Sequence, residues 1–294
     1  MDTFLIDIIK LFIVSFFICV HFILIGSFIY TRIFQVNEVK IDFSKKIFLA
    51  SFFISNLLIL INFLIPLGKL LTTILFTLPF LFYFLIEKKI RSKIINYSAK
   101  FALFSLFLIA YDNINRPDAG LYHYPFMKIL NEHKIIIGSA NLHFRFGHTS
   151  IMQYLSAGYN NYFFNEKGML IPLALIFYST AKYFYNKIKF YKNKNNLLFF
   201  FSLLVLFQIL FDMNRYSGFG NDVPAHLIVF ITAFYFLEKK FLRYEDFFYL
   251  SIMTIFAFQI KTTMLIILLL PFYILIKNLK FIKEKKNLFI FLII

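Results

Sequence analysis

The sequence has little of what a soluble fold or a disulfide-stabilised fold requires. Only 16% of its residues are charged, whereas soluble domains carry about 25%. Its hydrophobic fraction is 60%, with 45 Phe, which exceeds what the interior of one soluble fold of 294 residues can hold. Because Cys19 is the single cysteine, an intrachain disulfide and a cysteine-based metal site are both excluded. This composition is typical of a polytopic membrane protein.

The apolar runs are continuous rather than alternating, as in "FALFSLFLIAY" and "LLFFFSLLVLFQILF". Strands of a membrane barrel would alternate with period two, so the spans are expected to be helices. The run at about 11–30 is too long for a signal-peptide core, so it is expected to remain as the first span. We therefore predict an all-α, polytopic transmembrane bundle with about nine spans: 8–30, 47–65, 70–86, 94–111, 168–184, 197–211, 225–237, 247–260 and 264–276.

A tenth apolar run begins near Leu288 and stops after about eight residues, too few to cross about 30 Å of hydrocarbon. It predicts an incomplete tenth span and a continuation beyond residue 294. The whole of 1–294 is interpreted as one transmembrane domain, within which residues 112–150 form an extracytoplasmic active-site loop that carries a membrane-surface helix.

Connections rich in Lys and Arg alternate along the chain with connections that hold few of them. The connections 31–46, 87–93, 182–196, 238–246 and 277–287 hold 21 of the 31 basic residues, and the opposite set holds seven. The positive-inside rule places the first set in the cytoplasm and the amino terminus outside. The net charge of +16 is then explained by anionic membrane lipids as partners, without nucleic acid. The expected location is a bacterial inner (cytoplasmic) membrane.

The outward loop contains polar groups that a simple connector does not need. "YDNINRPDAGLYHYPF" precedes the amphipathic stretch "AGLYHYPFMKILNEHK", which is suited to a membrane-surface helix, and Thr149 or Ser150 can start the next helix. Four of the six histidines lie in this loop, at spacings that match no standard zinc site.

The order "D-A-G-L-Y-H-Y-P … I-I-I-G-S-A-N-L-H-F-R-F-G-H-T-S" resembles the first large outward loop of GT-C type membrane glycosyltransferases, which include the protein mannosyltransferases and bacterial lipid A sugar transferases. It is more closely similar to bacterial membrane proteins of unknown function with a "YD-x-x-LYH … NLH-x-R-x-G" loop. The resemblance implies a catalytic role for Asp118, support from Tyr122 and His123, and substrate contacts from Arg145. The sequence departs from the GT-C pattern in having Ala119 after the Asp and four spans before the loop.

Transfer of a sugar from a polyprenyl phosphate needs a base at the attacking hydroxyl and positive charge at the departing phosphate. Asp118 can supply the base, and Arg145, Arg116 or Lys261 can meet the phosphate. The alternative for Asp118 is a turn-forming role between Pro117 and Gly120. A divalent metal, Mg²⁺ or Mn²⁺, is left open as a cofactor, with Asp118 and Asp222 as its candidate ligands.

Two further polar points interrupt the apolar chain on the outward side. Asp222, in "NDVPAHL", suits the first turn of a helix, but it also resembles an S-x-D-x-P element that faces the cavity in the similar membrane proteins. Lys261, in "QIKTTM", either extends to the membrane interface or holds a lipid-linked phosphate. Asn221 and Arg215 are weaker candidates, while Asn62 and Gln208 are expected to form helix-to-helix hydrogen bonds.

The resulting hypothesis is an integral membrane glycosyltransferase that uses a polyprenyl-phosphate-linked sugar and a cell-envelope glycan or lipid acceptor. A transporter or flippase is the first alternative, although ionisable groups gather outside the spans rather than at the bilayer midplane. A glycan polymerase of the cell envelope is the second, and it would share the compartment and the lipid donor.

Overall fold

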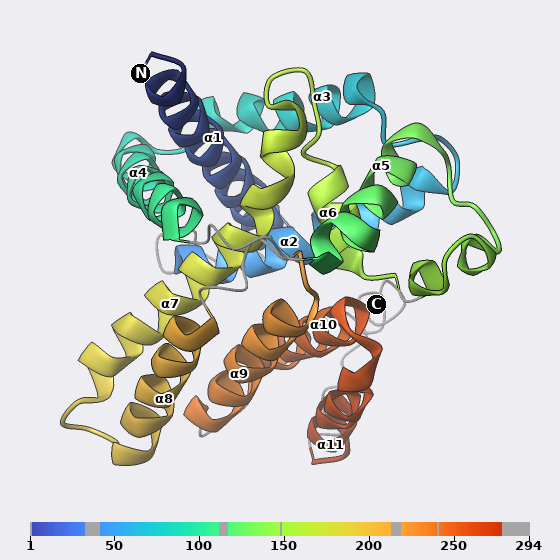
Figure 1. The fold of residues 1–294 in the computed structure, drawn as a ribbon. Helices are drawn as coiled ribbons and strands as arrows, with labels where there is room; N and C mark the ends of the chain where they lie inside the picture. Colours follow the sequence, from blue (N-terminus) through green and yellow to red (C-terminus); the bar gives the residue numbers. More distant parts are fainter. Residues whose placement is uncertain are drawn as a thin grey trace.

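The computed structural model describes residues 2–32, 42–111, 117–147, 149–212, 219–239 and 241–277, and within these ranges it is all-helical, without strands. Figure 1 shows the order of the elements. The longer helices are α1 (Asp2–Arg32), α2 (Phe43–Asn62), α4 (Lys88–Tyr111), α7 (Ile171–Tyr191), α8 (Asn196–Asp212), α9 (Asp222–Glu238) and α10 (Tyr244–Ile260). The shorter elements are α3 (Lys69–Thr77), η2 (Leu78–Leu85), η3 (Ala119–His123), α5 (Tyr124–Glu132), η4 (Ser139–Asn141), η5 (Phe144–Gly147), α6 (Ile151–Ala157), η6 (Asn165–Leu170), η8 (Thr262–Leu268) and α11 (Leu269–Lys277).

Each of the nine expected apolar segments coincides with helical structure, but the helices differ in length. By length and composition, two of those described are long and apolar enough to cross a membrane, Leu5–Arg32 and Phe43–Asn62. Shorter apolar helices cover Lys69–Phe84, Asn196–Asp212 and Thr262–Lys277. The tenth expected span, near Leu288, lies outside the described residues.

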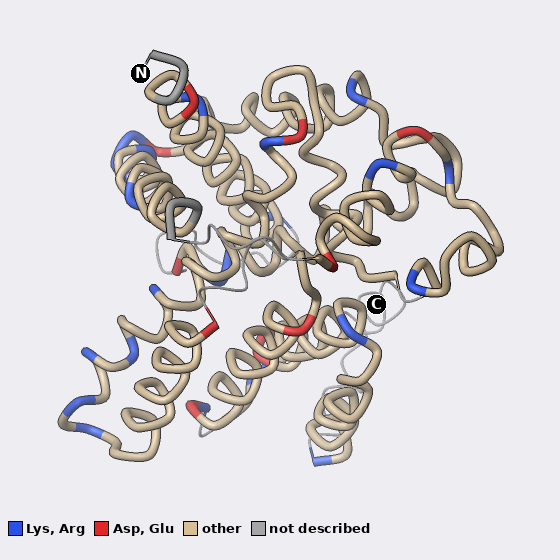
Figure 2. Tube along the Cα trace, viewed as in Figure 1, with Lys and Arg blue, Asp and Glu red and all other residues tan. Residues whose placement is uncertain are grey.

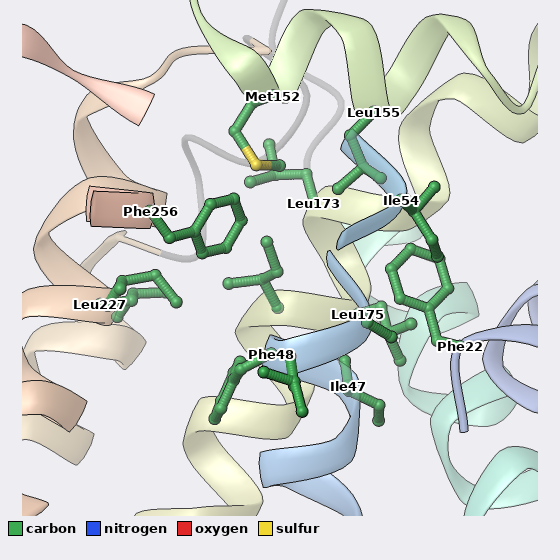
Figure 3. Close-up of a cluster of buried hydrophobic side chains, with 14 of the residues drawn as sticks. Phe22, Ile47, Phe48, Ile54, Met152, Leu155, Leu173, Leu175, Leu227 and Phe256 are labelled. Atoms are coloured by element: carbon green, nitrogen blue, oxygen red, sulfur yellow. The ribbon is translucent and has the colours of Figure 1, made fainter. Parts of the chain in front are cut away.

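The interior is apolar and is shared by helices that are distant in the sequence. Figure 3 shows Phe48 and Ile54 of α2 lying in one cluster with Phe256 of α10 and Leu173 of α7. Side chains such as Phe22, Phe48 and Phe256 are fully buried there. Close packing of these side chains holds α2 against the α7–α10 half of the bundle through van der Waals contact.

The outer surface is also apolar, which is unusual for a folded chain. On α8 the side chains of Leu197, Phe200, Leu204, Phe207 and Phe211 are between 56% and 73% exposed, and their spacing puts them on one helical face. Similar exposed residues cover α11, α1 and α4, including Ile276, Leu5 and Leu103. Soluble monomers rarely expose contiguous apolar patches larger than a few hundred Å², so this surface is of the kind that a protein partner or a lipid bilayer covers.

The basic connections contact one another at one end of the bundle. Lys187 forms an ion pair with Glu238, which joins the connections 182–196 and 238–246. The ammonium group of Lys45 lies 4.0 Å from the ring centroid of Tyr235, whose hydroxyl donates to Asp246 at 2.5 Å. Figure 2 shows Lys and Arg toward the end of α7, in the turn that leads to α8, and at the end of α11. Three of the connections expected on the cytoplasmic side therefore meet in space.

The sparsely charged connections form a second group of contacts. The backbone N–H of Leu67 donates to the carbonyl of Leu130 at 2.9 Å, and the amide of Asn62 donates to the carbonyl of His133 at 3.1 Å. These bonds join the connection after α2 to the large loop 112–148. In these examples the basic connections contact other basic connections, and the sparsely charged connections contact each other.

The amphipathic stretch of the loop forms a helix, α5, as expected, but its apolar face is used within the protein. Phe126, Met127 and Leu130 are buried, and the Phe126 ring lies 5.6 Å from that of Phe146 in η5. Leu121, at the preceding turn, stays 65% exposed. The face predicted to cover a membrane surface instead packs on η5 and α6, and it holds the loop close to the bundle.

Candidate functional site

One pocket brings together residues from three sparsely charged connections that are far apart in the sequence. Its volume is about 840 Å³, and it lies between the η3–η5 region and the junction of α9 with α10 and η8. Six of the candidate residues from the sequence line it: Asp118, Tyr122, His123, Arg145, Asp222 and Lys261. Pro117, Gly147, Thr149, Gly220, Asn221, Val223, Ile260, Thr262 and Thr263 complete its wall.

Asp118 stands at the start of the single π-helical turn η3. Its side chain makes no capping hydrogen bond to this turn. It is hydrogen-bonded instead to Tyr122, one turn later in the chain. Burial, and then this bond to the carboxylate, raise the pKa of the Tyr122 hydroxyl, which keeps it a donor. The turn therefore presents an exposed carboxylate whose orientation is supported by Tyr122.

Arg145 reaches the same pocket from η5. Its guanidinium carbon lies 5.3 Å from the ring centroid of Tyr122 and 5.1 Å from that of Phe144, within the range of cation–π attraction. Among the described residues, no carboxylate lies within salt-bridge distance of it. The flat guanidinium is thus held by aromatic rings while its hydrogen-bond donors remain available to a ligand.

Asp222 and Lys261 face each other across the break between two helices. Asp222 is the first residue of α9, where the preceding Asn221 makes no side-chain cap, and Lys261 has an extended backbone that ends α10. The Lys261 ammonium lies 2.5 Å from an Asp222 carboxylate oxygen. The two side chains are 31% and 62% exposed, so this pair remains accessible to water and to a ligand. Asp222 therefore combines a first-turn position with a contact in the pocket.

His123 is the most buried of the six residues, at 5% exposed, and its protonation is set by Gln153 of α6. The backbone N–H of Ser150 donates to Gln153 Oε1 at 3.0 Å, which fixes that oxygen as the acceptor end of the amide. Gln153 Nε2, 3.0 Å from His123 Nδ1, must then donate to it. Nδ1 is therefore the acceptor nitrogen, and the proton of the neutral ring is on Nε2.

Burial also lowers the pKa of His123 to about 4, even though the nearby Asp118 and Asp222 carboxylates act in the opposite direction. At neutral pH the imidazole is consequently uncharged, with Nε2–H as a donor that a pocket ligand can meet. Its role is that of a fixed hydrogen-bond donor rather than of a cation or a base.

Gln153 was missed at the sequence level, although the signal was present. Ser150 and Gln153 form a capping box, with the Ser150 hydroxyl accepting from Met152 N and the Gln153 side chain accepting from Ser150 N. The S-x-x-Q spacing is a known helix-start pattern. Ser150 was expected to start a helix, and it does. The spacing does not reveal that the helix is buried, and its burial brings the Gln153 amide into contact with the His123 ring.

The polar residues expected within spans have mixed outcomes. Asn62 joins α2 to the end of α5 through the carbonyls of Leu130 and His133, as an interhelical bond should. Gln208 was expected to bond to another helix, but its amide donates to Asp212 of the same helix, α8, because i and i+4 share one face. The interhelical amide pair is formed instead by Asn56 and Gln259, which join α2 to α10.

The weaker candidates Arg116 and Arg215 are outside the described residues, as are Asp112 and His148, whereas Asn221 lines the pocket. His133 ends α5 as an exposed residue, while the His143 ring stacks 6.3 Å from that of Tyr122. Within the described ranges, no group of three or more His, Cys, Asp or Glu side chains is placed to hold a metal ion.

The arrangement is chemically specific. Two carboxylates and two cations converge with a neutral imidazole in one water-accessible space, and none of the four charges is deeply buried. A carboxylate can accept a proton from a hydroxyl, and Arg and Lys can contact an anionic oxygen. Thr149, Thr262 and Thr263 add hydroxyl groups of the kind that hydrogen-bond to polar substrates.

A comparison with protein-family models finds one match over nearly the whole chain. The model of DUF8201, described as a domain of unknown function, matches residues 8–294. Neither the curated proteins nor the solved structures contain a match.

Proposed function

The chain belongs to the DUF8201 family, and we propose that it is an integral membrane glycosyltransferase of the GT-C type. In this proposal it moves a sugar from a polyprenyl-phosphate donor to a cell-envelope glycan or lipid acceptor. The observation that carries the proposal is the single pocket in which Asp118, Arg145, Asp222 and Lys261 meet. These residues come from separate outward connections, and together they supply the two kinds of group that the reaction requires.

Membrane placement is the first part of the proposal. In this proposal the chain forms a bundle of about nine spans in a bacterial inner membrane, with the amino terminus outside. Support comes from the apolar outer faces of α8 and α11 and from the separate contacts of the basic and the sparsely charged connections. Because the pocket residues belong to the sparsely charged set, the pocket opens on the extracytoplasmic side, where polyprenyl-linked sugars and acceptors can meet.

In the chemical step, Asp118 accepts the proton of the acceptor hydroxyl as its oxygen attacks the anomeric carbon of the sugar. A new carbon–oxygen bond forms to the acceptor, and the bond from the anomeric carbon to the phosphate oxygen breaks. The electron pair of the broken bond stays on the phosphate, whose added charge Arg145 and Lys261 stabilise. Arg145 offers a bidentate fork and Lys261 a point charge, and the Asp222 pairing positions Lys261 until the phosphate arrives.

Tyr122 and His123 support this step without changing charge. Tyr122 holds the Asp118 carboxylate by a hydrogen bond, so that a lone pair faces the acceptor. The neutral His123, with its proton on Nε2, donates a hydrogen bond to a sugar or phosphate oxygen. Both residues act over a wide pH range because burial keeps their charged forms unfavourable.

The described residues do not form a divalent metal site by themselves. Asp118 and Asp222 are the two carboxylates of the pocket, and Asp222 already holds the Lys261 ammonium. In this proposal the side-chain cations Arg145 and Lys261 stabilise the charge on the phosphate.

The test compares wild type with Asp118→Asn in membranes supplied with radiolabelled polyprenyl-phosphate sugars. Loss of a positioned general base lowers the transfer rate by about 10²–10⁴-fold. Glu132→Gln is the matched control, since this exposed carboxylate ends α5 and does not line the pocket. Transfer at the wild-type rate by Asp118→Asn would refute the assignment. Normal glycans with lost solute uptake would favour a transporter instead.

A further inference from the structure

A second cavity lies on the flank of the bundle, and the proposed reaction does not use it. This cavity, the flank groove, has a volume of about 630 Å³ and lies between α1, the continuous helix formed by α3 and η2, and the segment before α7. Its apolar wall is Ile13, Val14, Phe17, Phe76, Phe80, Phe163 and Phe164. On α1, residues 10, 13, 14 and 17 repeat at helical spacing, so one face of this helix forms a whole side of the groove.

The aromatic rings form a continuous lining rather than separate contacts. The ring centroids of Phe76 and Phe80 are 5.2 Å apart, and those of Phe76 and Phe164 are 4.9 Å apart. Phe17 lies 6.1 Å from Phe80 and is 43% exposed, while Phe163 is 59% exposed. The rings thus pack against each other on one side and leave apolar surface open on the other. Such a surface fits a hydrocarbon chain.

The rim of the groove carries positive charge. Lys10 and Lys167 line it, and Lys167 forms an ion pair with Asp7. Lys69 lies beside them, with its ammonium donating to Asn165 Oδ1 at 2.7 Å. Three ammonium groups therefore surround the mouth with two carboxylates, Asp7 and Glu166, of which Glu166 is paired with Lys128; an excess of positive charge remains above an apolar floor. That combination is complementary to a molecule with an anionic head and a hydrocarbon tail.

The flank groove is separate from the pocket at Asp118, because the two share no lining residue. A chain of contacts nevertheless joins their surroundings. Glu166, next to the rim, pairs with Lys128 of α5 at 3.1 Å and is hydrogen-bonded to Tyr124, which follows His123 in the chain. An occupant of the groove would therefore lie beside the segment that anchors α5.

We propose that the flank groove binds an anionic phospholipid of the surrounding bilayer, with one acyl chain along the phenylalanine lining and the phosphate on Lys10 and Lys167. This inference rests on the membrane placement proposed above and not on the transferase activity. At a membrane surface each lysine favours an anionic headgroup by a factor of about five, so two lysines favour it about thirtyfold. The expected selectivity over a zwitterionic lipid lies between these two factors, since Asp7 offsets part of the charge.

The sequence offers a direct reporter, because the chain contains no tryptophan. Phe17→Trp places a single indole in the groove, and Phe207→Trp places one on the exposed face of α8, outside it. Each variant is reconstituted in nanodiscs of zwitterionic lipid that contain a small fraction of phosphatidylglycerol or phosphatidylcholine with brominated chains, which quench indole fluorescence on contact. Phe163→Trp, at the opposite wall, serves as a second groove reporter if Phe17→Trp fails to fold.

The groove reporter should be quenched at a five- to thirtyfold lower fraction of brominated phosphatidylglycerol than of brominated phosphatidylcholine. The α8 reporter should respond equally to both lipids. Replacing Lys10 and Lys167 with Gln should abolish the preference while leaving quenching by phosphatidylcholine unchanged. None of these readouts depends on sugar transfer, so they remain decisive even if the proposed activity is wrong.

Three results would overturn the proposal. Equal quenching by the two lipids in the groove would make it an ordinary part of the lipid annulus. Relief of quenching by soluble glycerol phosphate would show that the lysines bind a headgroup without a chain. Stronger displacement by a long-chain polyprenyl phosphate than by unlabelled phosphatidylglycerol would assign the groove to that lipid instead.

Discussion

The substitution Gln153→Glu tests whether the protonation of His123 is set by α6. The change keeps the shape of the side chain and keeps an oxygen to accept from Ser150 N, so the capping box is retained. It replaces the amide that donates to His123 Nδ1 with a titratable carboxyl group. The variant therefore alters the proton on the ring without removing the buried contact.

The magnitude follows from the contact distance. The amide nitrogen that is replaced lies 3.0 Å from Nδ1, and an opposite charge at such range raises an imidazole pKa by about 1–3 units. The pKa of His123 would rise from about 4 to roughly 5–7. This value is the apparent pKa of a titration step shared by the histidine and the new carboxyl group. At pH values above this apparent pKa the ring is neutral, and its remaining proton is on Nδ1, which donates it to the introduced carboxylate. Nε2 is then unprotonated, whereas in the wild-type protein Nε2 carries the proton and donates into the pocket.

The assay is the histidine titration by nuclear magnetic resonance of ¹⁵N-histidine-labelled protein, with the pH profile of sugar transfer measured in parallel. His123→Gln identifies the resonance. Gln153→Glu should show a new step above pH 5, with transfer falling above that step. Gln153→Met leaves His123 Nδ1 and Ser150 N without partners, and each lost hydrogen bond should lower the free energy of unfolding by about 1–3 kcal/mol. The titration of His123 in this variant should show no new step above pH 5. Identical wild-type and Gln153→Glu titrations would refute this account of the ring.

Three further predictions concern stability, which can be followed by thermal unfolding in detergent. Because the pKa of His123 is lowered to about 4 in the folded protein, the unfolded chain binds a proton at this residue below pH 6.5 and the folded chain does not. The free energy of unfolding should therefore fall by about 3 kcal/mol as the pH is lowered from 6.5 to 4. His123→Gln should not show this loss. Gly26→Ala places a Cβ 2.2 Å from the Lys46 carbonyl oxygen and should cost about 1–3 kcal/mol or more, whereas Gly120→Ala meets open space and should be nearly neutral. Asp246→Asn should lower the free energy of unfolding by about 3–5 kcal/mol, because it leaves the half-buried Lys239 without its carboxylate partner. A decrease of less than about 1 kcal/mol would show that the fold does not depend on this ion pair.

The members of the candidate pocket could be found from the sequence because charge is scarce in this chain. Asp118, Asp222 and Lys261 interrupt long apolar stretches, so each is conspicuous where it occurs. Their convergence on one pocket could only be conjectured, since 104 residues separate Asp118 from Asp222 and no local pattern reports such a distance. The pairing of Lys261 with Asp222 likewise depends on how α10 ends beside the start of α9.

Residues without charge were the ones missed. Gln153 lies in "SIMQYLSAG", which reads as an ordinary helix start, and its function behind His123 follows from the burial of α6. The apolar face of α5 illustrates the same difficulty, because hydrophobic spacing identifies a buried face without stating whether lipid or protein covers it. In α5 the cover is Phe146 and Tyr154.

The sequence alone predicted the helical class, because its apolar runs are continuous and lack the period-two alternation of strands. It also determined which connections are basic and which carry the sparse acidic and histidine groups. Only the tertiary structure decided that these sparse groups share one pocket, that Gln153 orients His123, and that phenylalanines from α1, η2 and the segment before α7 line a second groove. The physical reason is that charge and hydrophobicity are properties of single residues, whereas a site is a property of distances between residues that only packing sets.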